Sequence, residues 1–230
     1  MYFFYESPIT WVIAIISFII ALGAQIGVKS AYGKYSKIRV ECSMTGSDIA
    51  RMIVNNTGVA VVEHHGGKMS DHFDPREKTI ALSPEVYNGS TVAALGIAAH
   101  EAGHALQHDQ GYAPIKIRNG ILPVAQIGSF LAMPMVILGL ALSGSGFEIL
   151  IDIGIILFTA ALLFQIITLP VEFNASRRAV SILDSNAYLT KSELSGAKGM
   201  LRAAAMTYVA AVVTTILQLV RLLMIANRRR

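Results

Sequence analysis

The chain has 230 residues, of which 53% are apolar and only 15% are charged, and its mean hydropathy is +0.54. This composition is typical of a membrane protein and excludes a large multidomain receptor or a soluble oligomeric enzyme. The net charge of +4 comes from Lys and Arg that flank apolar segments. It therefore indicates membrane topology rather than nucleic-acid binding. The single cysteine, Cys42, excludes an internal disulfide framework and a multi-cysteine zinc cluster.

Four apolar segments are candidates to cross a bilayer as helices: residues 9–28, 121–142, 149–171 and 203–226. About 20 apolar residues span the hydrocarbon core, and the first three segments have that length. We expect the first to be an uncleaved anchor, because its apolar run is too long for a signal peptide. The fourth contains Gln218 and Arg221, so it is either a short span or a re-entrant or interfacial helix.

Basic residues are concentrated after the first segment, before the second, and between the third and fourth. The positive-inside rule therefore places these regions in the cytoplasm, and residues 1–8 and 143–148 on the other side. Residues 228–230, which are all arginine, contradict this arrangement if the fourth segment spans the membrane. The basic residues inside the chain still favour the cytoplasmic assignment.

The longest polar region, residues 29–120, is predicted to be a small α+β domain. Thr45 and Asp48, followed by Ile49, Met52 and Ile53, predict a capped amphipathic helix that ends at residues 56–58. The remaining elements that we expect are strands at 59–63 and 79–83, a turn-rich segment at 64–75, and a helix at 90–108.

The helix at 90–108 contains the run His100-Glu101-Ala102-Gly103-His104, which matches H-E-x-x-H. Positions four apart lie on one face of a helix, so both imidazoles can reach one Zn²⁺ while Glu101 faces its water molecule. Zinc activates the water to attack a peptide carbonyl, and Glu101 can take its proton as general base. The pattern also arises by chance, but an unliganded trio would be costly to bury in this apolar run.

The third zinc ligand must come from elsewhere in the chain. His108 is about 12 Å along the helix from His100, so one ion cannot bind both. A metzincin would have Gly and His where this chain has Gln107 and Gln110. Two His and one Glu with an open fourth position are a catalytic zinc set, which favours Glu172 at the end of the third apolar segment.

The alternative for Glu172 is an interfacial carboxylate paired with Arg177 or Arg178. Both arginines are expected to point away from the face of Glu172 and toward phospholipid. Pro170 is expected to start or kink the helix that carries Glu172.

The sequence predicts five segments. They are an N-terminal transmembrane anchor (1–28), a cytoplasmic α+β zinc-peptidase domain (29–120), a transmembrane hairpin (121–171), a helix with the third ligand and a linker (172–202), and a C-terminal transmembrane or interfacial helix with a basic tail (203–230).

Four runs together resemble the YugP-type neutral zinc metallopeptidases of bacterial membranes: SDHFDPREKT from Ser70, HEAGHALQH from His100, LPVEFNASRRA from Leu169 and AAMTYVAA from Ala204. The resemblance covers nearly the whole chain. It extends more distantly to the membrane metalloproteases of the HtpX and CAAX-prenyl-protease type, in which a later E-x-x-A-D motif supplies the third ligand.

This resemblance implies a mainly α membrane protein with about four transmembrane helices and a small gluzincin-like α+β domain. It implies a multi-pass protein of the bacterial inner (plasma) membrane with one zinc ion held by His100, His104 and Glu172. Its partners would be polypeptides, such as unfolded or membrane proteins, and the lipid bilayer, with no nucleic acid.

The chain departs from the distant relatives at Ser176, where they have Asp. If that Asp orients a ligand histidine, other residues must help here, and Asp71 and Asp74 are candidates. Candidates to donate to the oxyanion are His72 and Tyr208, and the alternative for His72 is packing in a turn. His108 either orients a ligand or lies at the surface. The strand at 79–83 is either the edge strand along which such peptidases align a substrate or an internal strand.

Two other functions remain open. A non-catalytic zinc-stabilised scaffold or chaperone would bind zinc but would not need Glu101. A site-2-type intramembrane protease also uses H-E-x-x-H, but its third ligand is an Asp in a later span, in an Asp-Gly-type motif that this sequence does not contain.

Overall fold

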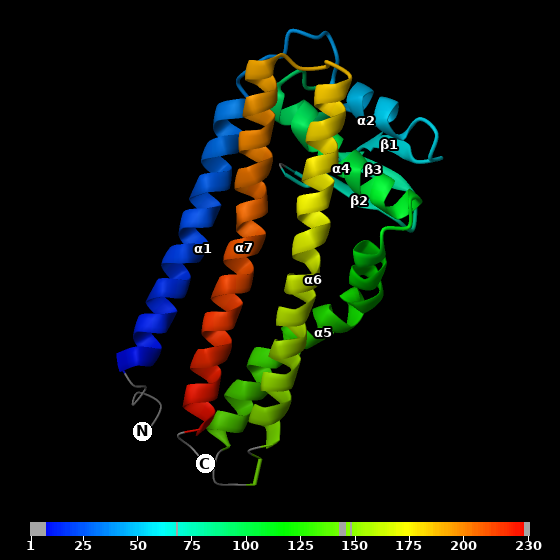
Figure 1. Ribbon diagram of the computed structural model, residues 1–230. Coiled ribbons are helices and arrows are strands. Elements are labelled where there is room, and N and C mark those ends of the chain that lie inside the picture. Colours follow the sequence, from blue (N-terminus) through cyan, green and yellow to red (C-terminus); the bar gives the residue numbers. More distant parts are fainter. Residues whose placement is uncertain (1–7, 68, 143–145, 148, 228–230) are drawn as a thin grey trace. The chain divides into compact units, whose positions relative to one another are not determined.

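The structure, a computed structural model, describes residues 8–67, 69–142, 146–147 and 149–227 (Figure 1). Its elements are, in order, α1 (Pro8–Tyr35), α2 (Gly46–Val54), β1 (Ala60–Glu63), β2 (His72–Asp74), β3 (Thr79–Leu82), α3 (Pro84–Tyr87), α4 (Val92–Asp109), α5 (Ala113–Ala141), α6 (Ile149–Ser185) and α7 (Lys191–Asn227). The predicted class, a mainly α membrane protein with a small β part, is confirmed.

Among the described residues, four helices are long and apolar enough to cross a membrane: α1, α5, α6 and α7. Each contains one of the four predicted segments. With 37 residues each, α6 and α7 are about 55 Å long, nearly twice the thickness of a bilayer's hydrocarbon core. The fourth segment lies within α7, which has no break at which a re-entrant segment could turn back.

The chain folds into two compact units. The first, which we call the helical unit, consists of Met1–Ala24, Ile117–Leu169 and Thr207–Arg230. The second, the sheet unit, consists of Gln25–Lys116 and Pro170–Met206. Residues 1–7, 143–145, 148 and 228–230, which enter the predicted topology, lie outside the described residues.

Helix α6 contributes to both units and continues through Pro170. Of the two alternatives expected for Pro170, the start of a helix is therefore wrong. A proline inside a helix removes one backbone hydrogen bond, and α6 has enough others on either side to remain continuous. The residues of α6 after Pro170 belong to the sheet unit.

Helix α2 belongs to the sheet unit and has the capped start that the sequence predicts. The Thr45 hydroxyl accepts a hydrogen bond of 3.2 Å from the Asp48 amide, and the Asp48 carboxylate accepts one of 2.9 Å from the Thr45 amide. This reciprocal pair is a capping box. Ile49 and Val54 of α2 are buried in the core.

The sheet has the strand order β1-β3-β2. The central strand β3 pairs in parallel with β1 and antiparallel with β2. The hypothesis that residues 79–83 form an edge strand is therefore wrong, and the internal-strand alternative is confirmed. The sequence did not predict β2, because its three residues lie in a turn-rich segment and acquire strand geometry only by pairing with β3. The edges of the sheet are β1 and β2.

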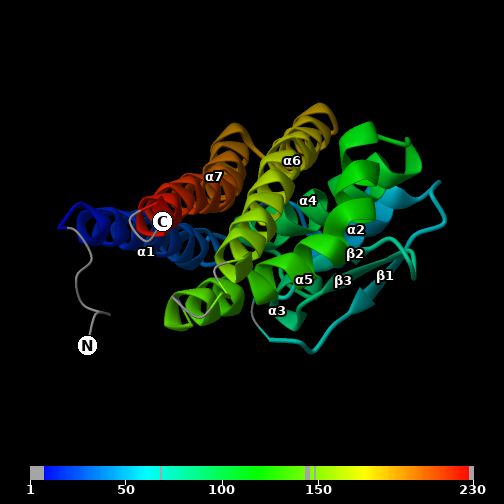
Figure 2. The ribbon, with the colours of Figure 1, turned by 90° about the horizontal axis from the view of Figure 1, so that it is seen from below.

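Helix α4 packs against α2, β2 and β3 in the core of the sheet unit (Figure 2). Its contacts use alanines: Ala98, Ala99 and Ala102 have no exposed surface. Small side chains let neighbouring elements approach closely along the whole helix. The sheet-unit parts of α6 and α7 complete this core with Leu183 and Leu201.

Candidate metal centre

Helix α4 presents His100 and His104 side by side. The helix begins after Thr91, whose hydroxyl accepts a hydrogen bond of 3.2 Å from the Ala94 amide. The two imidazoles are one turn apart, and their ring centroids are 4.7 Å apart. Regular α-helix geometry is thus sufficient to bring the two rings together.

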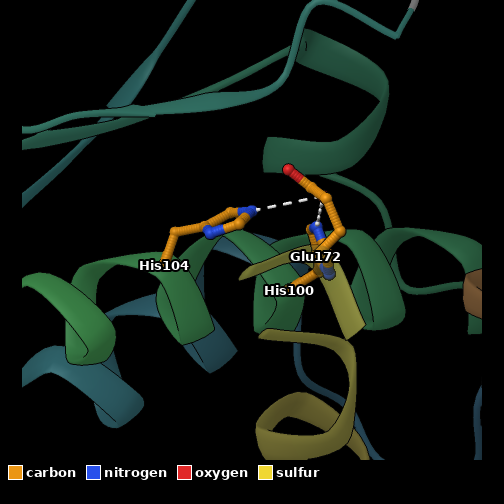
Figure 3. Close-up of side chains that lie close together, drawn as sticks. All are labelled: His100, His104 and Glu172. Carbon is orange, nitrogen blue, oxygen red and sulfur yellow. Dashed lines mark ion pairs between the residues drawn. The ribbon is translucent and has the colours of Figure 1, made fainter. Parts of the chain in front are cut away.

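Glu172 of α6 completes the group. One of its carboxylate oxygens, Oε2, lies 3.4 Å from Nε2 of His100 and 3.6 Å from Nε2 of His104 (Figure 3). A tetrahedral zinc ion with bonds of ~2.0–2.1 Å would separate its ligand atoms by about 3.3 Å. Each of the three residues offers one ligand atom, and these three atoms all lie within 4.8 Å of one another. The three donors therefore fit one zinc ion.

Gly103, between the two histidines, allows α6 to come this close. A Cβ atom at this position would lie 2.8 Å from the carbonyl oxygen of Ala175 on α6. Contacts that short do not occur between folded segments without a shift of the backbone. The glycine of the H-E-x-x-H run therefore helps to set the distance between Glu172 and the histidines.

The other ring nitrogen of each histidine has a polar partner. Nδ1 of His100 is 3.2 Å from Oγ of Ser176, and Nδ1 of His104 is 3.0 Å from Oε1 of Gln107. An amide oxygen only accepts, so Nδ1 of His104 carries the proton and donates it. In the neutral imidazole, Nε2 of His104 is then the nitrogen left free for a metal ion, whereas in the imidazolium it donates to Glu172. Such outer partners fix the orientation and tautomer of metal-binding histidines.

A hydrogen-bonded network continues from Gln107, which has no exposed surface. Nε2 of Gln107 donates to the Val171 carbonyl at 2.8 Å and to Oδ1 of Asn174 at 2.9 Å. Arg178 donates to the same Asn174 oxygen at 2.7 Å and to Gln110 at 2.5 Å. The expectation that Arg178 faces phospholipid is therefore wrong, because its guanidinium is engaged in this network.

Glu101 is buried, with 9% of its surface exposed. Burial raises the pKa of its carboxyl group, and the neighbouring imidazoles of His100 and His104 oppose this rise. Burial also disfavours the imidazolium form of His104, but its hydrogen bond with Glu172 and the charges of Glu101 and Glu172 outweigh burial and raise its pKa.

Asp71 and Asp74, which were expected to orient a ligand, are engaged elsewhere. Asp71 accepts hydrogen bonds from the amide and the hydroxyl of Ser83, at 2.7 and 3.0 Å. Burial raises its pKa despite these bonds. Asp74 accepts from the amides of Arg76 and Glu77, at 2.7 and 3.4 Å. Both carboxylates thus hold loops of the sheet unit together.

The remaining candidates lie in three different surroundings. His72 is exposed on the edge strand β2 and donates from Nδ1 to the Ser70 carbonyl at 2.8 Å. His108 packs on Phe73, with ring centroids 5.8 Å apart. Tyr208 belongs to the helical unit.

Sequence patterns did not identify Gln107 and Asn174 as partners of the ligands. Gln107 stood out only as a mismatch to another peptidase class. A signal was present, because Gln107 follows His104 by three residues and side chains at that spacing meet on a helix. Asn174 gave no such signal, since its contact with Gln107 joins two helices far apart in the sequence.

The fold and the site define a class: a membrane protein with a His-His-Glu group that could hold a metal ion. The family model described as "Putative neutral zinc metallopeptidase" matches residues 10–227, and the chain belongs to this family. It is 44% identical over 204 residues to "Putative membrane protease YugP" of Bacillus subtilis (strain 168), which covers 88% of this chain and 89% of the relative. No solved structure matches the chain significantly.

Proposed function

We propose that the protein is a zinc-dependent endopeptidase of the bacterial inner membrane and that Glu101 is its general base. The observation that carries this proposal is the convergence of His100, His104 and one oxygen of Glu172 beside the buried Glu101. Family membership supports the same reaction class.

In this mechanism His100, His104 and Glu172 hold one zinc ion. When bound, zinc supplies a Lewis acid that polarises the scissile carbonyl and lowers the pKa of a water molecule. Glu101 accepts the proton of the attacking water and passes it to the leaving amine. Burial makes its carboxylate a stronger base than an exposed one, because it raises the pKa.

The edge strand β2 is the proposed docking site for the substrate backbone, since β3 is internal. An extended peptide can add to a free sheet edge through main-chain hydrogen bonds, with little dependence on its side chains. This would suit unfolded or membrane proteins as substrates. His72 on β2 is the proposed partner of the oxyanion.

The proposed topology places the active site on the cytoplasmic side. Lys116 and Arg118 in the first turns of α5 and the basic residues that follow the apolar part of α6 support this orientation. A fusion reporter at the C-terminus, together with accessibility of the β2–β3 turn in spheroplasts, tests it.

The reaction itself is tested with purified wild type and Glu101→Gln. Bound zinc is measured by mass spectrometry of the metal, and cleavage is assayed with unfolded casein and a membrane-protein substrate. We expect equal zinc in both proteins and cleavage by the wild type only. Glu77→Gln, an exposed carboxylate in the β2–β3 turn, is the matched control and should cleave normally.

A non-catalytic scaffold would give a different result. It would hold zinc in both proteins and cleave nothing in either. If Glu101→Gln still cleaves the substrates, Glu101 is not the general base.

A further inference from the structure

An open groove with a volume of about 570 Å³ lies between α6 and α7 within the sheet unit. Ser176 forms part of its wall, and the hydroxyl of Ser176 contacts His100. The groove therefore adjoins the candidate metal centre, but the three metal-binding side chains do not line it. The mechanism proposed above gives this groove no role.

The groove carries an excess of positive charge. Arg177, Lys198 and Arg202 line it, against the single carboxylate of Asp184. In the part of the chain that the structure describes, none of these three cations has a carboxylate within ion-pair distance. Arg177 donates to the Phe173 carbonyl of its own helix, at 3.4 Å. Three cations around one groove with no carboxylate in ion-pair contact among the described residues attract an anion.

The groove has a polarity gradient along the helices. Phe173 and Ala205 line the end from which α6 and α7 continue into their apolar stretches, residues 149–169 and 207–227. Arg177 and Arg202 lie about one turn further from those stretches. A ligand that fits this order has an apolar part on the membrane side and a negative group beyond it.

We propose that the groove binds one anionic phospholipid, with its phosphate at Arg177 and Arg202 and the start of its acyl chains along Phe173 and Ala205. A free anion would use the cations and leave the apolar end without a function, whereas a zwitterionic lipid would bring no net charge to them. The site rests on the membrane location of the protein and not on its peptidase activity. It would place a lipid headgroup beside the residue that contacts His100.

The experiment uses the full-length protein in a mild detergent, titrated with phosphatidylglycerol or with phosphatidylcholine of the same acyl chains. Native mass spectrometry measures the lipid retained by each protein. We expect phosphatidylglycerol to be retained with at least about tenfold higher affinity, as two or three cations near a headgroup provide. The double variant Lys198→Gln/Arg202→Gln should lose this preference.

The matched control is Lys191→Gln/Arg76→Gln, which removes one Lys and one Arg that are exposed and do not line the groove. It should retain the lipid like the wild type. Ser181→Trp is a second, independent variant, because it fills the groove from an exposed position without changing its charge. It should also lose the lipid. Zinc content and elution volume show that each variant is folded.

Several results would overturn the proposal. One is equal retention of the two lipids by the wild type. Another is an equal loss of lipid in both double variants, which would mean that the attraction comes from overall charge. Complete displacement of the lipid by inorganic phosphate would indicate a simple anion site. If the groove variants keep phosphatidylglycerol but bind unfolded casein more weakly, the groove belongs to the substrate.

Discussion

The side-chain amide of Gln107 donates a hydrogen bond of 2.8 Å to the main-chain oxygen of Val171. Gln107 lies three residues after one proposed ligand, His104, and Val171 immediately precedes another, Glu172. The same amide accepts from His104 through its oxygen. One buried side chain therefore fixes both the imidazole and the segment of α6 that carries the carboxylate.

Gln107→Ala should lower zinc affinity by roughly 10- to 100-fold, the effect expected when a partner of a metal-binding histidine is removed. Competition with a fluorescent zinc chelator measures this affinity. Gln110→Ala is the control, because the side chain of Gln110 accepts from Arg178 at the exposed end of the network. Equal affinity in Gln107→Ala and wild type would show that Gln107 does not orient His104.

Glu172→Ala should bind less zinc than wild type at the same free zinc concentration, because only two of the three proposed ligands remain. Metal analysis after gel filtration measures the stoichiometry. Glu77→Ala serves as the control for a general change in charge. Unchanged stoichiometry in Glu172→Ala would exclude this residue as a ligand.

Gly103→Ala should destabilise the protein by roughly 1–3 kcal/mol, because its methyl group would overlap the carbonyl of Ala175. Moving α6 away would also lengthen the distances between Glu172 and the histidines, so zinc affinity should fall. Thermal unfolding in detergent and chelator competition measure the two effects.

Gly96→Ala on the same helix is the matched control for Gly103→Ala. Its methyl group would meet Ala197 Cβ at 3.6 Å, an ordinary contact. The change should therefore be neutral or slightly stabilising, as alanine is a better helix former than glycine. If the two variants unfold at the same temperature, close packing at Gly103 is unimportant.

Ser176→Ala should weaken zinc binding by about tenfold, because the 3.2 Å contact of the hydroxyl with His100 is lost. Ser176→Asp should bind zinc at least as tightly as wild type, since a carboxylate accepts more strongly from the imidazole than a hydroxyl does. Chelator competition compares the three proteins. Tighter binding by Ser176→Ala than by Ser176→Asp would contradict this role.

Asp48 gives a prediction for the pH dependence of stability. Hydrogen bonds from the side chain and backbone of Thr45 lower its pKa below the ordinary value of 3.8. Its ionised form therefore stabilises the folded state at any pH above that value, and this contribution is lost as the pH falls through the lowered pKa. Asp48→Ala should unfold at a lower temperature than wild type at pH 7, and the difference should narrow below about pH 4.

Thermal unfolding between pH 3 and pH 7 tests this expectation, with the exposed Glu77→Ala as the control. A difference between Asp48→Ala and wild type that is constant over the whole range would mean that the capping carboxylate contributes no pH-dependent stability.

Local patterns in the sequence were enough to predict the membrane class, the long helices, the capped start of α2, and the position of His100, Glu101 and His104 on one helix. Each of these features depends on residues close together in the chain. Hydropathy, capping and a four-residue spacing act within one element, so they can be read without knowing what that element packs against.

Only the tertiary structure decided which groups meet across elements. β3 became the central strand because β2 folds back onto it, Gln107 reached Val171 because α4 and α6 pack closely at Gly103, and Arg178 donated to Gln110 instead of facing lipid. These contacts join different elements of the fold, and their geometry depends on side-chain volume and backbone approach. The motif in the sequence thus determined the candidate chemistry, while packing between α4 and α6 determined which side chains hold its ligands in place.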